Sequence, residues 1–193
     1  MGPGRPRLTV PVTDSTGQAG LSAEAEAVLA VLERNRRAFA WKTGGLDRGG
    51  LAATTAATSM TLGGLVKHMA LVEADWLVVK LAGHPYGPPW DEVDFDADPD
   101  WEWRTGAQDA PEEVYALWRS AVRRSREVVA AALQEGGMDA ATRFTGRDGR
   151  PASVREMLLD MIEEYARHTG HADLLRESVD GLAGESPPRE FRL

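Results

Sequence analysis

The sequence predicts an all-α protein whose architecture is a four-helix bundle with long connections. Four segments of about 20 residues place apolar side chains three and four positions apart, the period of a helix with one buried face. No segment longer than a few residues shows the pattern of a strand. A chain of 193 residues can bury one sizeable core, so we expect a single domain.

The first two predicted helices cover residues 22–42 and 61–82. Ser22 is a favourable N-cap, and Gly44 with Gly45 ends the first helical pattern. The apolar side of the first helix consists of Val28, Leu29, Leu32 and Phe39. The apolar side of the second, which ends before Gly83, consists of Leu62, Leu65, Met69, Val72, Trp76 and Val79.

The third and fourth predicted helices cover residues 111–134 and 153–178. Pro111 suits the first helical position, and Gly136 with Gly137 stops the third helix. Its apolar side consists of Val114, Leu117, Ala121, Val128 and Ala132. Ser153 and Glu156 form an S-x-x-E capping box at the start of the fourth helix, after a Gly- and Pro-containing connection.

The segments outside these helices set the expected domain limits. Residues 1–20 are rich in Gly, Pro, Ser and Thr and predict a flexible arm, residues 21–184 the bundle, and residues 185–193 a tail. The long connection at residues 84–110 combines proline and aspartate with Trp90, Phe95, Trp101 and Trp103. Such aromatic content favours packing over disorder, so the connection is expected either to cover a site as a lid or to brace the bundle.

Composition narrows the partners and the location. A net charge of −8 argues against nucleic acid. We interpret the arginine clusters at residues 34–37 and 119–126 as solvated helix faces, and a site for an anionic small molecule is the alternative. The sequence has no apolar run long enough for a membrane span and no hydrophobic leader, so we expect a cytoplasmic protein. With no cysteine, any thiol chemistry must use a thiol brought by a cosubstrate.

The stretch EEYARHTGHADLLRE, residues 163–177, places polar side chains where the fourth helix should be apolar. Glu164, His168 and His171 continue the row begun by Met157 and Met161 at steps of three and four. A carboxylate and an imidazole four residues apart on one helix face can converge on a metal ion. A hydrogen-bonded Glu–His pair inside the bundle is the alternative explanation.

A third ligand has to come from another helix, and His68 is the histidine available in the second one. His68, Glu164 and His168 would leave an open coordination position, as catalytic zinc sites do. His68 is otherwise a structural histidine beside the apolar stripe. The ligand set suits Zn²⁺ first, and also Ni²⁺, Fe²⁺ or Mn²⁺.

Other residues near this row have weaker assignments. His171 is expected to carry a proton or to hydrogen-bond to a ligand, because an enzyme needs the fourth position free. His84, followed by proline in a loop, is expected at the surface. Trp76 and Tyr165 are candidates for lining a pocket, although aromatics at helical spacing are usually core residues.

Two motifs make the chain resemble a known superfamily. LGGLVKHMALVEADWL contains K-H-x(4)-E-x-x-W, and SVREMLLDMIEEYARHTGHADLLRESVDGLAG contains E-E-x-A-R-H-x-G-H-A-D-L-L-R-E-x-x-D-G. Over roughly residues 22–184 the sequence resembles the DinB/YfiT-like superfamily of metal-binding four-helix proteins. Within it, the chain is most similar to an uncharacterised actinobacterial subfamily near the mycothiol-dependent maleylpyruvate isomerases.

The resemblance implies an up-down-down-up bundle with a divalent metal held by His68, Glu164 and His168. Many members have three histidines, and Glu164 replaces one of them, as in the mycothiol-dependent isomerases. Asp160 stands where relatives often have a further histidine, so the role of that position is open. The Ala-, Gly- and Arg-rich composition is typical of a GC-rich genome, for which mycothiol is the expected thiol.

The expected function is therefore a metal-dependent thiol S-transferase, or a thiol-assisted isomerase, that acts on a small electrophile. A bound metal would stabilise the thiolate of mycothiol, the reactive form of the cosubstrate. Two alternatives are a non-catalytic bundle that binds a small molecule and a thiol-independent cyclase or hydrolase of specialised metabolism. Pairing of helix faces into a homodimer is a further expectation from the resemblance.

Overall fold

The computed structural model describes residues 20–191, and this part of the chain is mostly helical. Its long helices are α1 (Ala23–Thr43), α3 (Leu62–Ala74), α5 (Pro111–Gly136) and α6 (Val154–Asp180). Its shorter elements are α2 (Arg48–Ala52), η1 (Asp75–Lys80), η2 (Trp90–Glu92), α4 (Trp101–Gly106), β1 (Ala141–Thr145) and β2 (Pro151–Ser153). The arm predicted at residues 1–20 lies, except for its last residue, outside the described residues.

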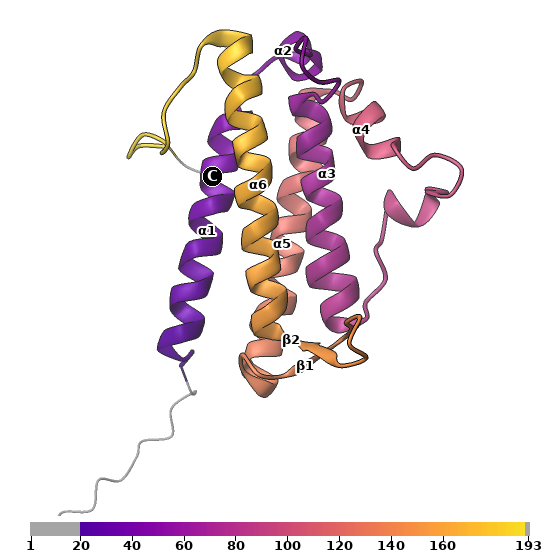
Figure 1. The fold of residues 1–193 in the computed structure, drawn as a ribbon, viewed down its shortest axis with the longest axis vertical. Helices are drawn as coiled ribbons and strands as arrows, with labels where there is room; N and C mark the ends of the chain where they lie inside the picture. Colours follow the sequence, from indigo (N-terminus) through magenta and orange to yellow (C-terminus); the bar gives the residue numbers. More distant parts are fainter. Residues whose placement is uncertain (1–19, 192–193) are drawn as a thin grey trace, which may run out of the picture.

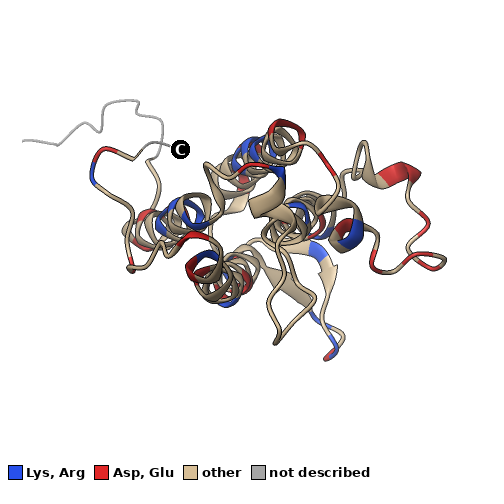
Figure 2. Ribbon diagram, turned by 90° about the horizontal axis from the view of Figure 1, so that it is seen from above, with Lys and Arg blue, Asp and Glu red and all other residues tan. Residues whose placement is uncertain are grey.

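The long helices lie side by side, with α1 and α6 running in one direction and α3 and α5 in the other (Figure 1). Helix α1 packs along α6, while α3 packs along α5 and also contacts α4 and α6. In Figure 2, which views the molecule from above, the segment that carries η2 projects from the helices and is rich in Asp and Glu. The contact between α3 and α6 is the part of this arrangement that positions the candidate site.

Each of the four predicted helices is present, and the predicted caps explain where α1 and α6 begin. The Ser22 hydroxyl accepts a hydrogen bond from the Ala25 N–H at 3.1 Å, which satisfies one of the free N–H groups of α1. Ser153 and Glu156 form the reciprocal capping box of α6. Helix α6 ends at Gly181, whose φ of 78° is the left-handed conformation that glycine adopts without strain.

The second predicted helix continues past α3 into η1, which is π-helical. A π turn holds more residues than an α turn and therefore shifts the face that the following residues present. Met69 and Val72, before η1, are buried as predicted. Within η1, Trp76 is only half-buried, and the buried residues are Leu77 and Val78. The predicted apolar stripe is therefore wrong beyond Val72.

A small antiparallel hairpin departs from the all-α expectation. Strands β1 and β2 occupy the connection before α6, which the sequence pattern placed in a loop, and they pair Ala141 with Ser153 and Thr145 with Pro151. The turn between them contains Gly149 at a φ of 76°. Strands this short give too few alternating positions for recognition from sequence.

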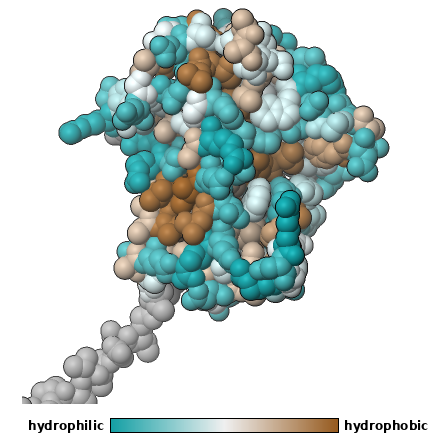
Figure 3. Space-filling model, in the orientation of Figure 1, coloured by the Kyte–Doolittle hydropathy of each residue, from teal (hydrophilic) through white to brown (hydrophobic). Residues whose placement is uncertain are grey.

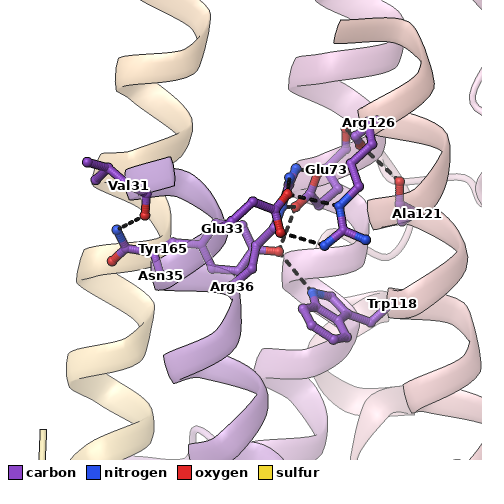
Figure 4. Close-up of polar contacts among 10 residues, drawn as sticks. Val31, Glu33, Asn35, Arg36, Glu73, Trp118, Ala121, Arg126 and Tyr165 are labelled. Atoms are coloured by element: carbon purple, nitrogen blue, oxygen red, sulfur yellow. Dashed lines mark hydrogen bonds and ion pairs between the residues drawn. The ribbon is translucent and has the colours of Figure 1, made fainter. Parts of the chain in front are cut away.

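A network of buried polar side chains connects the four long helices at their centre (Figure 4). Its members, here called the core network, are Arg36 of α1, Glu73 of α3, Trp118 of α5 and Tyr165 of α6. Arg36 Nε and Nη2 donate to the two carboxylate oxygens of Glu73 at 2.8 and 2.7 Å. Tyr165 donates to Glu73 Oε1 at 2.6 Å and accepts from Trp118 Nε1 at 3.0 Å. Burial raises the pKa of Tyr165 well above its ordinary value, so its hydroxyl stays a donor.

The position of Arg36 corrects the interpretation of the first arginine cluster as a solvated face. Its side chain is 2% exposed, and the Glu73 side chain is 0% exposed. Buried charges of this kind are tolerated because each is paired in a bidentate geometry. Arg37, by contrast, reaches the tail, where its Nη2 donates to the Pro188 and Phe191 carbonyl oxygens at 3.1 and 2.9 Å.

The surface mixes hydrophilic areas with hydrophobic patches on the face shown in Figure 3. Helix α6 leaves Leu159 and Leu174 exposed to solvent. Within residues 20–191, the helices lack the length and apolar character that crossing a membrane requires. The homodimer expected from the sequence stays a prediction.

Candidate metal centre

The row of polar residues on α6 lies at the edge of its buried face. His168 is buried and lines up with Met161 and Tyr165, whereas Glu164 and His171 are half-buried beside that row. The predicted row from Met157 to Leu175 thus combines two neighbouring rows of the helix. As a consequence, Glu164 keeps partial contact with water and is not enclosed by apolar side chains.

Helices α3 and α6 bring His68, Glu164 and His168 together. One candidate ligand atom from each residue lies within 4.8 Å of the other two. His168 Nε2 is 3.3 Å from Glu164 Oε2, and the rings of His68 and His168 meet edge to face with centroids 4.8 Å apart. Of the four histidines in the sequence, only His84 lies elsewhere, exposed in the loop after η1.

The donor set fits a divalent cation, and so does the spacing between its two members on α6. Ligand atoms at ~2.1 Å from one tetrahedral Zn²⁺ are about 3.4 Å apart, close to the spacing between His168 and Glu164. The side chains of His68 and Glu164 are 20% and 21% exposed, so two of the three residues keep partial contact with solvent.

His168 is held in the uncharged form that metal binding needs. Burial lowers its pKa to about 4, with further contributions from the nearby His68, His171 and Arg167. A neutral imidazole presents a free lone pair, so a cation need not displace a proton from His168 at neutral pH.

His171 lies one turn beyond His168 and contacts the nitrogen that faces away from Glu164. The two Nδ1 atoms are 3.3 Å apart, so one of them donates a hydrogen bond and the other accepts it. When His168 uses Nε2 as a ligand, its Nδ1–H is the donor and His171 the acceptor. The structure therefore places His171 where it can orient a ligand.

Two residues of α4 complete the surroundings of His68, and the sequence analysis did not assign them to the site. Glu102 Oε1 is 3.2 Å from His68 Nδ1, and the Trp103 ring stacks on the His68 imidazole at 4.3 Å with an interplanar angle of 23°. The aromatic content of residues 84–110 signalled that this segment packs, but helical spacing could not indicate where. The segment lies directly beside the candidate centre.

The two aromatic pocket candidates lie apart from these contacts. Trp76 packs against Phe144 of the hairpin and has the Lys80 ammonium 4.2 Å from its ring centroid. Tyr165 is fully buried in the core network. Asp160 is half-buried on α6 and does not belong to the group of converging ligand atoms.

The fold and this cluster define a mostly helical protein with a candidate metal site built from two histidines and one glutamate. Comparison with family models adds a specific assignment. A model described as mycothiol-S-transferase matches residues 27–181. The chain therefore belongs to the mycothiol-S-transferase family, which agrees with the DinB-like resemblance of its motifs. Neither the curated proteins nor the solved structures contain a match to the chain.

Proposed function

We propose that this protein is a divalent-metal-dependent S-transferase that joins a thiol, mycothiol, to a small electrophilic metabolite. The observation that carries the proposal is the convergence of His68 with Glu164 and His168 in a member of this family. We also propose that residues 21–184 form a DinB-like bundle of the up-down-down-up type. The direction of the long helices in Figure 1 supports this arrangement.

The three proposed ligands would hold Zn²⁺ in the first instance, with Ni²⁺, Fe²⁺ and Mn²⁺ compatible with the same donors. A cation bound there supplies a Lewis acid that lowers the pKa of an incoming thiol. The chain's own residues hold and shape the site: Glu164 and His168 provide two donors from one helix, and His68 provides the third from α3. The absence of cysteine is consistent with a sulfur that comes from the cosubstrate.

The proposed transfer is a nucleophilic substitution by the thiol sulfur at carbon. The thiol loses its S–H proton, its sulfur forms a bond to the electrophilic carbon, and the leaving group departs with the electron pair of the bond that breaks. In the isomerase variant of this chemistry, the sulfur adds to the substrate and later leaves again. His171, half-buried beside His168, is the proposed carrier of the thiol proton; to accept this proton, its Nδ1 has to release the hydrogen bond from His168.

Elemental analysis of the purified protein tests the metal part of the proposal. The wild type is expected to contain about one equivalent of a divalent metal, as a single three-donor site requires. Glu164→Ala and His168→Ala should contain little, because each removes a donor. His84→Ala is the matched control, since it removes an exposed histidine and should retain the metal.

Thiol consumption then tests the reaction. Wild-type protein with mycothiol and a chlorodinitrobenzene-type electrophile should consume thiol, and His168→Ala should lower the rate roughly 100-fold or more. Wild-type activity in that variant would contradict the metal-dependent mechanism. A metal-free wild type would favour the binding-protein alternative, and a metal-loaded protein without thiol consumption would favour a thiol-independent cyclase or hydrolase.

A further inference from the structure

Glu102 is a buried carboxylate whose hydrogen bonding is incomplete. Its side chain is only 6% exposed, and it comes from α4, in the connection between α3 and α5. One oxygen, Oε1, faces His68 Nδ1 at 3.2 Å, while Oε2 has no hydrogen-bond partner within the described part of the chain. Burial of a carboxylate is costly, so a position of this kind calls for an explanation.

The contact with His68 indicates what Glu102 does. A carboxylate accepts a hydrogen bond from an imidazole N–H and thereby keeps the proton on that nitrogen. With Nδ1–H directed at Glu102, His68 has only Nε2 left as a lone pair for a cation. Glu102 itself is not part of the converging ligand group, so its position fits orientation of a ligand and not coordination.

Trp103 fixes the plane of the same ring. Its indole stacks on His68 at a centroid distance of 4.3 Å and lies 6.2 Å from the His168 ring in a tilted geometry. Consecutive residues of α4 thus hold His68 in two ways. Glu102 sets the direction of its nitrogens, and Trp103 covers one face of the imidazole.

Helix α4 is held firmly against α3 next to this contact. Lys67, the neighbour of His68, donates to Thr105 Oγ1 at 2.8 Å and to Asp109 Oδ2 at 2.6 Å. The backbones also touch, because a Cβ added at Gly106 would lie 2.6 Å from the Gly63 carbonyl oxygen. These contacts follow Glu102 in the chain and hold the end of α4 against α3, so α4 is not described well as a hinged, opening lid.

We propose that Glu102 is a positioning residue that orients His68 for metal binding, which makes α4 a fixed wall of the metal centre. This inference rests on the proposed metal site. Such carboxylate partners of metal-bound histidines set the tautomer and increase the basicity of the ligand nitrogen. The negative charge of Glu102 additionally favours a cation nearby.

The tautomer of His68 in metal-free protein tests the orientation without any metal or turnover. Two-bond ¹H–¹⁵N correlation spectra at about pH 8, where an ordinary histidine is neutral, should show the Nδ1–H form in the wild type. Glu102→Gln keeps a carbonyl acceptor and should keep this form, whereas Glu102→Ala should lose it. Glu92→Gln, at an exposed glutamate of the same connection, is the matched control.

Titration with Co²⁺ alone, in competition with a chromophoric chelator, tests the consequence for the metal. Glu102→Ala is expected to weaken binding about 10- to 100-fold, Glu102→Gln by less, and Glu92→Gln not at all. An Nε2–H tautomer in the wild type, or a Glu102→Ala variant with unchanged tautomer and unchanged affinity, would overturn the proposal. A wild type that has the Nδ1–H form but binds no Co²⁺ would instead overturn the proposed metal function.

Discussion

The core network and the candidate metal centre both place polar side chains between α3 and α6, but they differ in how completely these groups are paired. In the core network, Glu73 accepts two hydrogen bonds from Arg36 and one from Tyr165. At the candidate metal centre, Glu164 Oε2 has the 3.3 Å contact with His168 Nε2, and the Glu164 side chain is 21% exposed. The fully paired groups of the core network stabilise one arrangement of the helices. The incompletely paired groups of the candidate metal centre keep their donor atoms available for a ligand.

Polar side chains between the helices therefore have two different roles in this protein. The core network involves one side chain from each long helix, so its geometry constrains how the helices pack. The metal centre depends on that packing, because His68 and His168 come from different helices. Substitutions in the two regions should therefore change different measured quantities.

Glu73→Ala should have the largest effect on stability. In the wild type, the Arg36 side chain is 2% exposed and pairs with Glu73 and Glu33, so the substitution leaves it with Glu33 alone. Because a buried charge then loses its main partner, we expect a loss of roughly 3–5 kcal/mol in the free energy of unfolding. Urea unfolding followed by circular dichroism measures this loss. Glu163→Ala is the control, because it breaks an exposed pair with Arg167 and should cost within about 0.5 kcal/mol.

A double replacement, Arg36→Met with Glu73→Leu, refines this prediction. Removing both charges leaves no unpaired ion, so most of the stability lost in Glu73→Ala should return. A double variant as unstable as the single one would mean that the network itself, and not the unpaired charge, determines stability.

The metal-free centre should make stability depend on pH through His168. Burial lowers the pKa of this imidazole from 6.5 to about 4, so below about pH 6.5 the unfolded chain binds a proton that the folded chain does not. Stability is therefore fully present above that pH and falls by up to about 3 kcal/mol as the pH decreases to about 4. Chelator-treated wild type and His168→Gln, unfolded in urea across this range, should differ by this slope. Equal slopes in the two proteins would contradict the buried, neutral state of His168.

Of these substitutions, Tyr165→Phe should change the free energy of unfolding least. It tests whether Tyr165 belongs to the core network or lines a pocket. It removes the hydrogen bond donated to Glu73 and the acceptor of Trp118, with an expected cost of about 1–2 kcal/mol. Metal content and the KM for the electrophile should stay at wild-type values. An increase in KM without a change in stability would instead support the pocket role that the sequence suggested.

The helices and their caps could be predicted because they depend on residues close together in the chain. Ser22, Ser153 and Glu156 form local hydrogen bonds, and these formed as expected. The buried faces were less predictable, since steps of three and four are compatible with two adjacent rows. On α5, the predicted row contains Leu117 and Ala121, whereas the buried row contains Trp118 and Val122.

The candidate site shows the same division between local and distant information. Glu164 and His168 share one helix, so their spacing alone indicated that they could meet. In the core network, the burial of Arg36 could have been predicted, because this residue stands four positions after Leu32 and three before Phe39, on the apolar row. No sequence pattern predicted the contact between Glu102 and His68, because it depends on how α4 packs against α3.

The contact between Gly63 and Gly106 limits how this protein can change. Both residues are glycines, so no side chain remains that a mutation could shorten. The distance between the backbones of α3 and α4 is therefore already at its minimum at this contact. Any side chain at either glycine would have to push the two helices apart and draw Glu102 and Trp103 away from His68. A single methyl group added at either position should therefore move α4 away from His68, whereas a closer approach of α4 to His68 would require changes in the side chains between them.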